Sequence, residues 1–123
     1  MNKGGRNKLG DRSCVDIAQM LKSNQVISIL NIANNQVSDK GMETLIEGVE
    51  KAQNLISFNI SGNLLTSNSC TQVSTRLPPI YRLLKKDSII ELNLSNNKIG
   101  DKGIEELIEV QGAAVFESNT SNL

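Results

Sequence analysis

One 15-residue stretch occurs twice in this chain, 62 residues apart, and this repetition constrains the fold more than any other feature. Residues 27–41 read ISILNIANNQVSDKG and residues 89–103 read IIELNLSNNKIGDKG, with eight of the fifteen positions identical. Such repetition indicates a chain built from one structural unit that stacks on copies of itself. The fold therefore depends on how many copies there are and how far apart they lie.

The second asparagine of each pair marks the copies. It is one member of a set of four, Asn7, Asn35, Asn63 and Asn97, with spacings of 28, 28 and 34 residues. In the last three copies, apolar residues stand eight, five and three positions before this marker and two positions after it. The shared pattern is L-x-x-L-x-L-x-x-N-x-L, with other apolar residues allowed at the leucine positions.

Each copy divides into a strand half and a helix half. The apolar alternation before the marker predicts a short strand with one buried face. Four residues after the marker stand the expected helix N-caps, Asp11, Asp39, Ser67 and Asp101. An apolar stripe follows at helical spacing, formed in the third copy by Cys70, Val73 and Leu77. Pro78 and Pro79 are expected to end that helix.

These motifs resemble the leucine-rich repeat proteins, in the ribonuclease-inhibitor-like subtype with 28-residue repeats. The resemblance covers roughly residues 7–110. It implies an α/β leucine-rich repeat solenoid, a short curved stack with parallel strands on the concave face and helices on the convex face. It also implies that the four marker asparagines point inward as a structural ladder that binds backbone groups. A buried amide without partners costs about 1–3 kcal/mol, which is a physical reason for the repetition.

The pattern divides the chain into three parts. Residues 1–26 form a degenerate first repeat, whose helix half covers the N-terminal end of the stack. Residues 27–110 hold three repeats, with an insertion near residues 78–87, and residues 111–123 form an irregular tail. Repeat arrays need polar caps, and none is recognisable here. We therefore expect either a piece of a longer array or end-to-end self-association through the uncapped ends.

The strand side chains that point away from the core are the expected protein-binding surface. They are Ile29, Asn31, Ser57, Asn59, Glu91 and Asn93. Strands about 4.8 Å apart would align the three asparagines as a polar stripe. This stripe has two interpretations: it offers hydrogen-bonding groups to a partner, or it is simply the usual sequence of this repeat.

The insertion offers a second candidate surface at the rim of the stack. Tyr81 is the only tyrosine and is followed by Arg82. One interpretation is a protruding basic contact site with a single aromatic side chain. The other is a tolerated insertion whose apolar residues cover the helix layer.

Composition narrows the function classes. Thirteen basic and thirteen acidic residues balance, so net charge favours neither a nucleic acid nor a membrane surface as partner. There is no histidine, and Cys14 and Cys70 share one helix column two repeats apart, so we expect free buried thiols and no metal or cofactor. No apolar run approaches the roughly 20 residues of a membrane span, and no signal peptide is visible, which favours a cytoplasmic, intracellular protein.

The leading functional hypothesis is a non-catalytic interaction module or scaffold that binds a protein partner through the concave face. An alternative that the resemblance implies is a structural component of a cytoskeletal or ciliary assembly, as in tropomodulin-like or axonemal repeat proteins. A GTPase-activating fragment is a third and weaker hypothesis. Activators with this repeat are acidic, whereas this chain is neutral, and none of its arginines lies in a motif that could be transferred.

Overall fold

The computed structural model describes residues 10–73 and 75–111. Along the chain the elements are α1 (Gly10–Ser23), β1 (Ile29–Asn31), α2 (Asp39–Lys51), β2 (Ser57–Asn59), the 3₁₀ turn η1 (Ser67–Cys70), α3 (Pro79–Leu84), β3 (Glu91–Asn93) and α4 (Gly100–Gln111). The predictions for Asn7, for the start of the first repeat and for residues 112–123 lie outside the described residues.

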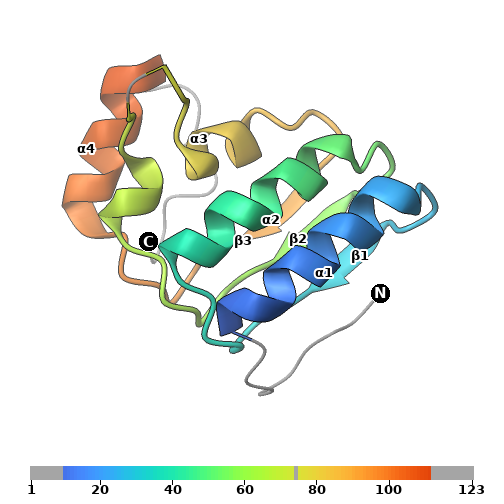
Figure 1. Ribbon diagram of the computed structural model, residues 1–123. Coiled ribbons are helices and arrows are strands. Elements are labelled where there is room, and N and C mark those ends of the chain that lie inside the picture. The colour runs from blue at the N-terminus through green and yellow to red at the C-terminus, as the bar shows by residue number, and fades with distance from the viewer. Residues whose placement is uncertain (1–9, 74, 112–123) are drawn as a thin grey trace.

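The three strands form one parallel sheet in the order β1-β2-β3, with one strand from each of the three full copies. The register follows the repeat, because Leu30 pairs with Phe58 and Phe58 pairs with Leu92. Helices α1 and α2 lie side by side on the same side of this sheet (Figure 1). The predicted solenoid, with parallel strands on one face and helices on the other, is confirmed.

The core fills the space between the sheet and the helices. Leu30 and Phe58 reach it from the strands, and Leu45 and Val49 reach it from α2; all four are buried. Gly48 lets α1 and α2 approach closely, because a Cβ there would lie 2.6 Å from the Cα of Ala18. None of the helices in residues 10–73 and 75–111 combines the length and apolar character needed to cross a bilayer.

The third repeat departs from the predicted helix. After the turn at Asn63, the predicted helix is reduced to the four residues of η1. The predicted stripe residues Val73 and Leu77 are 66% and 42% exposed. Pro79 begins a helix rather than ending one, since proline is well placed in a first helical turn. The β-branched side chains of Thr71, Val73 and Thr75 and the two following prolines disfavour a regular helix between η1 and α3.

Helix α3 nevertheless occupies a regular repeat position when residues are counted back from the next marker. Ile80 and Leu83 stand 17 and 14 residues before Asn97, as Ile46 and Val49 stand before Asn63, and all four apolar side chains are buried. The extra residues of the long repeat therefore lie in 71–77, ahead of α3. The insertion was predicted near residues 78–87, whereas this count from the next marker places the extra residues ahead of α3.

Candidate functional site

The marker asparagines form hydrogen bonds with the backbone of the turns that follow the strands. The Oδ1 of Asn63 accepts hydrogen bonds from the backbone N–H groups of Asn35 and Val37, at 3.1 and 2.9 Å. Its Nδ2 donates to the carbonyl oxygens of Ile32 and Ile60, at 3.1 and 3.0 Å. One buried amide therefore ties together the backbones of two successive repeats.

The same pattern recurs at the next marker. Asn97 accepts from the N–H of Leu65 at 3.1 Å and donates to the carbonyl oxygens of Ile60 and Leu94, both at 3.0 Å. In the preceding copy, the Nδ2 of Asn35 donates to the carbonyl oxygen of Ala33 at 2.9 Å. These bonds make the strand-to-turn segment rigid, which suits a surface that must present side chains in fixed positions.

The first residue of each pair has a different task. Asn34, Gly62 and Asn96 have φ values of 60°, 65° and 57°, in the left-handed region. Glycine enters this region freely and asparagine does so more easily than other residues, so the chain alternates between these two. This conformation was not among the predictions, although the last three copies hold only Asn and Gly at this position, which is a signal for it.

The concave asparagines also serve the backbone. Asn31, Asn59 and Asn93 lie in register across the sheet. The Oδ1 of each accepts a hydrogen bond from the N–H two residues later, at 3.0 Å in all three copies. The oxygens of Asn59 and Asn93 also accept from the hydroxyls of Ser61 and Ser95, at 2.7 and 2.6 Å, so the amide N–H groups are the part of these side chains best able to bind a partner. This arrangement favours the interpretation that the column is part of the repeat itself.

The other predicted concave column is chemically mixed. Ile29, Ser57 and Glu91 lie in register on neighbouring strands. Ile29 and Glu91 are exposed and Ser57 is half-buried. From β1 to β3, the face therefore passes from an apolar side chain through a hydroxyl to a carboxylate.

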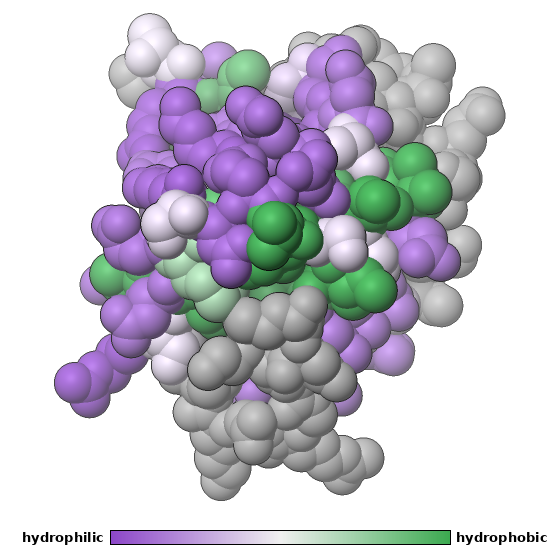
Figure 2. Space-filling view, turned by 90° about the vertical axis from the view of Figure 1, so that its right-hand side faces the viewer, coloured by the Kyte–Doolittle hydropathy of each residue, from purple (hydrophilic) through white to green (hydrophobic). Residues whose placement is uncertain are grey.

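An apolar rim, which was not among the predictions, borders this face where the strands begin. It consists of the exposed side chains Val26, Ile29, Ile56 and Ile90. Figure 2 shows hydrophobic atoms gathered on this side of the molecule, bordered by hydrophilic ones. The Ile90 N–H donates to the carbonyl oxygen of Ile56 at 2.9 Å, so these two residues follow each other on adjacent repeats. The available signal was the column seven residues before the marker, apolar in its last two copies.

Tyr81 and Arg82, which were predicted to form a separate contact site at the insertion, lie on α3, against α2. The Nε of Arg82 donates to the Oε2 of Glu50 at 2.9 Å, and a second guanidinium nitrogen contacts the other carboxylate oxygen. The hydrogen bond to Glu50 raises the pKa of Arg82. Tyr81 is half-buried and packs against the core. Both side chains therefore anchor α3 to the helix layer.

The predicted N-caps Asp39 and Ser67 are one residue too late, because Ser38 and Thr66 occupy the cap positions of α2 and η1. Asp11 and Asp101 likewise lie inside α1 and α4, which begin at Gly10 and Gly100. The carboxylates of Asp11 and Asp39 bridge repeats instead. The Oδ1 of Asp11 accepts from the N–H of Ser38, and the Oδ1 of Asp39 accepts from the N–H of Thr66, both at 2.8 Å. Asp39 also accepts from the Thr66 hydroxyl at 2.5 Å. A second ladder between repeats thus runs beside the asparagine ladder.

The described residues offer little reactive chemistry. Cys14 and Cys70 are free and buried, as predicted, and burial raises their pKa values to about 11 and about 12. Thiols in this state are poor nucleophiles. In residues 10–73 and 75–111, no group of three or more histidine, cysteine or acidic side chains is arranged to hold a metal ion.

Comparison with known sequences points to one repeat family. The family model described as "Leucine Rich repeat" matches residues 23–45 and 88–107. The ribonuclease inhibitor of Mus musculus is 33% identical over 95 residues, which are 76% of this chain and 20% of that protein. Ran GTPase-activating protein 1 of Saccharomyces cerevisiae is 31% identical over 108 residues, which are 86% of this chain and 25% of that protein. The chain thus spans about a fifth to a quarter of the length of these two relatives.

Comparison with solved structures agrees on the fold. The chain resembles the solved structure "Leiomodin-1 Actin-Binding Site 2 (ABS2)" with a TM-score of 0.72 and 18% identity, over 89% of this chain and 61% of that one. The repeat period and the parallel sheet of this chain agree with a leucine-rich repeat fold. The chain is a leucine-rich repeat protein of the ribonuclease-inhibitor-like type.

Proposed function

We propose that this chain is a non-catalytic interaction module that binds a protein partner across the concave strand face and its apolar rim. The observation that carries the proposal is the in-register sheet, which presents Ile29, Ser57 and Glu91 as one row and the three concave asparagines as another. Both rows stand on turns tied by the buried asparagine ladder. A surface held so rigidly loses little conformational entropy when it binds.

The two parts of the surface suggest different contributions. The apolar rim can bury Val26, Ile56 and Ile90 against a partner, and burial of apolar area is the main favourable term in most protein associations. The asparagine row offers amide N–H groups, which suit carbonyl or carboxylate oxygens on the partner. We therefore expect a partner surface with an apolar ridge beside exposed oxygen acceptors.

The test is affinity capture with surface variants. Arg at Asn59 or Asn93 would also remove a turn hydrogen bond, so the cleaner change is Ser57→Arg combined with Glu91→Arg. This variant should keep its urea midpoint and lose the partner that the unchanged chain captures. Val73→Arg, on the opposite, helix side, is the matched control and should capture normally. Normal capture by the concave variant, or loss with the control alone, would place the binding surface elsewhere.

A second candidate is GTPase activation, which the similarity to Ran GTPase-activating protein 1 favours. Arg76 and Arg82, two of the described arginines, lie next to glutamates of α2. Measuring GTP hydrolysis by Ran with and without this chain decides the question. An acceleration lost on mutation of a single arginine would replace the non-catalytic proposal.

The cytoskeletal alternative is tested by sedimentation with filamentous actin, because the leiomodin-1 structure that this chain resembles is an actin-binding site. At 18% identity this likeness concerns the fold, and actin binding by this chain is a separate hypothesis. Co-sedimentation that the Ser57→Arg, Glu91→Arg variant abolishes would identify actin as the partner of the concave face. A cytoplasmic location belongs to the same proposal, and imaging of a tagged chain would test it.

A further inference from the structure

The hydrogen bonds between successive repeats are periodic, so they predict what the outer edge of β3 can accept. The residue three before each marker donates its N–H to the next repeat: Ile32 to the carbonyl of Asn59 at 2.9 Å, and Ile60 to that of Asn93 at 3.0 Å. The residue one before the marker also donates its N–H to the next repeat: Asn34 to the carbonyl of Ser61 at 2.9 Å, and Gly62 to that of Ser95 at 3.0 Å. Each strand thus presents two N–H donors towards the following copy.

The equivalent groups of the last repeat are Leu94 and Asn96. Leu94 is only 2% exposed, yet its N–H has no acceptor in the described part of the chain, and the same holds for the N–H of Asn96. The N–H of Ile99 is a third such donor within residues 10–73 and 75–111, whereas its counterparts Val37 and Leu65 donate to a marker asparagine of the next copy. Three donors at this edge are therefore placed for oxygens of an added segment.

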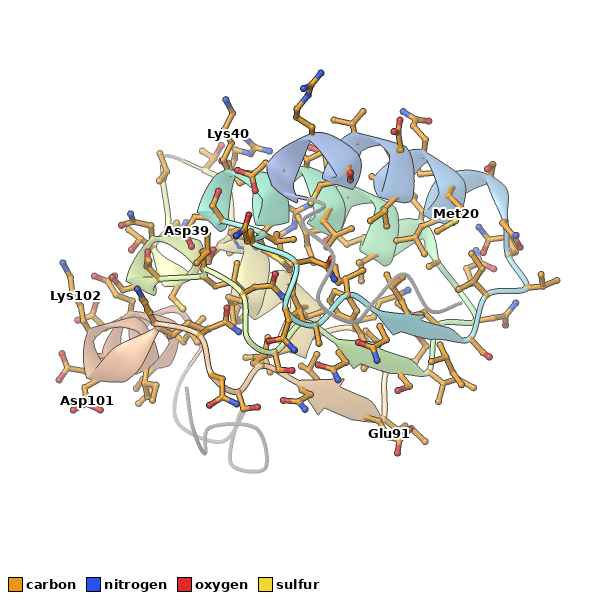
Figure 3. All side chains as sticks on the ribbon, turned by 90° about the horizontal axis from the view of Figure 1, so that it is seen from below. Met20, Asp39, Lys40, Glu91, Asp101 and Lys102 are labelled. Atoms are coloured by element: carbon orange, nitrogen blue, oxygen red, sulfur yellow. The ribbon has the colours of Figure 1, made fainter. Side chains whose placement is uncertain are left out.

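Asp101 supplies a fourth group at the same end. It stands in the column of Asp11 and Asp39, each of which accepts a backbone N–H and a hydroxyl from the next repeat. Figure 3 shows Asp101 at the start of α4 and Glu91 on β3, both at the open end of the stack. In the part of the chain that the structure describes, no donor bonds to the Asp101 carboxylate.

The space beside this edge is already hollow. A cleft of about 500 Å³ is lined by β2 and β3, and its walls also include Leu84, Ile89 and Lys86. Of its β3 residues, Leu92 is apolar and Glu91 is charged. Leu84, Ile89 and Leu92 are only partly buried. The cleft joins the apolar rim at Ile90, which lines both. An added segment could therefore bury apolar side chains while its backbone pairs with β3.

We propose that the outer edge of β3 binds an extended polypeptide segment as a fourth parallel strand. Its first pairing residue and the residue two positions later accept from Leu94 and Asn96. An asparagine four residues after the first pairing residue accepts a hydrogen bond from the N–H of Ile99. A serine or threonine seven residues after the first pairing residue donates its N–H and its hydroxyl to the carboxylate of Asp101. These offsets are those by which Asn59, Ser61, Asn63 and Thr66 meet the preceding repeat. The cleft shares Ser57, Asn59, Glu91 and Asn93 with the concave face of the proposed function, so slowed exchange at Leu94 and Asn96 is the measurement that separates the two sites.

A second copy of this chain is a poorer occupant than a separate segment. Head-to-tail stacking would require β1 of the second copy to supply its own Ser38 to Asp101. The N–H of Ser38 already donates to Asp11 of its own chain, and so does its hydroxyl. The proposed occupant is therefore a segment of the same repeat type whose serine or threonine is free.

The test uses the full chain and a synthetic peptide of residues 27–41, which carries Asn35 and Ser38 at the required offsets. The peptide should bind and should slow amide hydrogen exchange at Leu94 and Asn96. Asp101→Ala in the protein should weaken binding by about tenfold to a hundredfold, the usual effect of losing a hydrogen bond to a charged group. Asp16→Ala, an exposed acidic residue on α1, is the matched control and should leave binding unchanged.

A peptide with Ser38→Ala should bind the unchanged protein as weakly as the original peptide binds the Asp101→Ala variant. The proposal is overturned if the original peptide does not bind up to about 1 mM, a very weak affinity. It is also overturned if Asp101→Ala leaves the affinity for the peptide unchanged, or if amide hydrogen exchange slows on the concave strands instead of at Leu94 and Asn96. Sedimentation of the protein alone that shows a dimer, lost in Asp101→Ala, would make a second copy the occupant and refute the stated one.

Discussion

The second and third repeats begin alike and then diverge. Both have a three-residue strand, a left-handed residue before the marker and a buried marker asparagine. The second continues into the regular helix α2, whereas the third has a 3₁₀ turn, irregular stretches at residues 71–73 and 75–77, and the short helix α3. The strand-to-turn half thus varies little while the helix half varies freely.

The difference follows from what each half must satisfy. The strand and turn share hydrogen bonds with neighbouring copies, and a shift of one residue would leave buried donors unpaired. The helix half needs only to place apolar side chains over the sheet, and Ile80 and Leu83 do this as well as Ile46 and Val49. The ion pairs of Arg76 with Glu43 and Glu47, at 3.5 and 3.6 Å, are exposed and contribute little.

The largest expected effect concerns the two cysteines, which share a column but lie in a regular helix and in a 3₁₀ turn. Both are fully buried, so labelling by a thiol reagent should be slower than in the unfolded chain by roughly a thousandfold or more, because it requires an opening of several kcal/mol. Faster labelling of Cys70 than of Cys14, measured at neutral pH, would show that the irregular repeat opens on its own.

The same thiols predict a pH dependence. Their pKa values in the folded chain, about 11 and about 12, lie above the ordinary value of 9.0, so folding favours the protonated thiols. Their contribution to stability is fully present below pH 9 and is lost as pH rises through the folded pKa values. Replacing both cysteines by alanine should flatten this fall in urea midpoints above pH 9, and an unchanged slope would contradict the assignment.

The next effect compares one helix column in the two repeats. Leu45 in α2 is fully buried and Val73 in the irregular segment is 66% exposed. Leu45→Ala should therefore cost about 2–5 kcal/mol in urea unfolding, and Val73→Ala no more than about 0.5 kcal/mol. Similar losses in the two variants would mean that residues 71–77 form a helix after all.

Loss of a marker asparagine should come third. Asn63→Ala removes the acceptor of two backbone N–H groups and the donor to buried carbonyl oxygens. Each unsatisfied group costs about 1–3 kcal/mol, and partial hydration should hold the total to about 2–4 kcal/mol. Thermal or urea unfolding measures it. If Asn63→Ala lost less free energy of unfolding than Asn34→Ala, the asparagine ladder would not explain why the marker is repeated.

The smallest effect concerns Asn34, whose φ of 60° lies in the left-handed region. Asn34→Ala should cost about 1 kcal/mol, because a Cβ without a compensating side chain is strained in the left-handed region. Asn34→Gly should cost less, as Gly62 already occupies the same position of the next repeat. Equal free energies of unfolding for the two variants would show that the backbone conformation is not the constraint.

Much of the strand half was predictable from the chain alone. The spacing of the markers and of Leu30, Phe58 and Leu92 predicted one strand per repeat and its register, because a repeated unit must pair with itself in the same way each time. The inward orientation of the marker asparagines came from the family resemblance, and the hydrogen bonds of Asn63 show what that orientation does.

Other features were decided only in three dimensions. The sequence could not tell that Val73 points outward and Ile80 inward, since both fit an apolar stripe and the choice depends on where α3 meets α2. From the sequence, Arg82 could be assigned to an exposed basic contact site. The fold places Glu50, 32 residues away along the chain, within hydrogen-bond distance of its guanidinium group. Local pattern determined the hydrogen-bonded half of each repeat, whereas the packing of distant segments decided which side chains remain exposed to bind a partner.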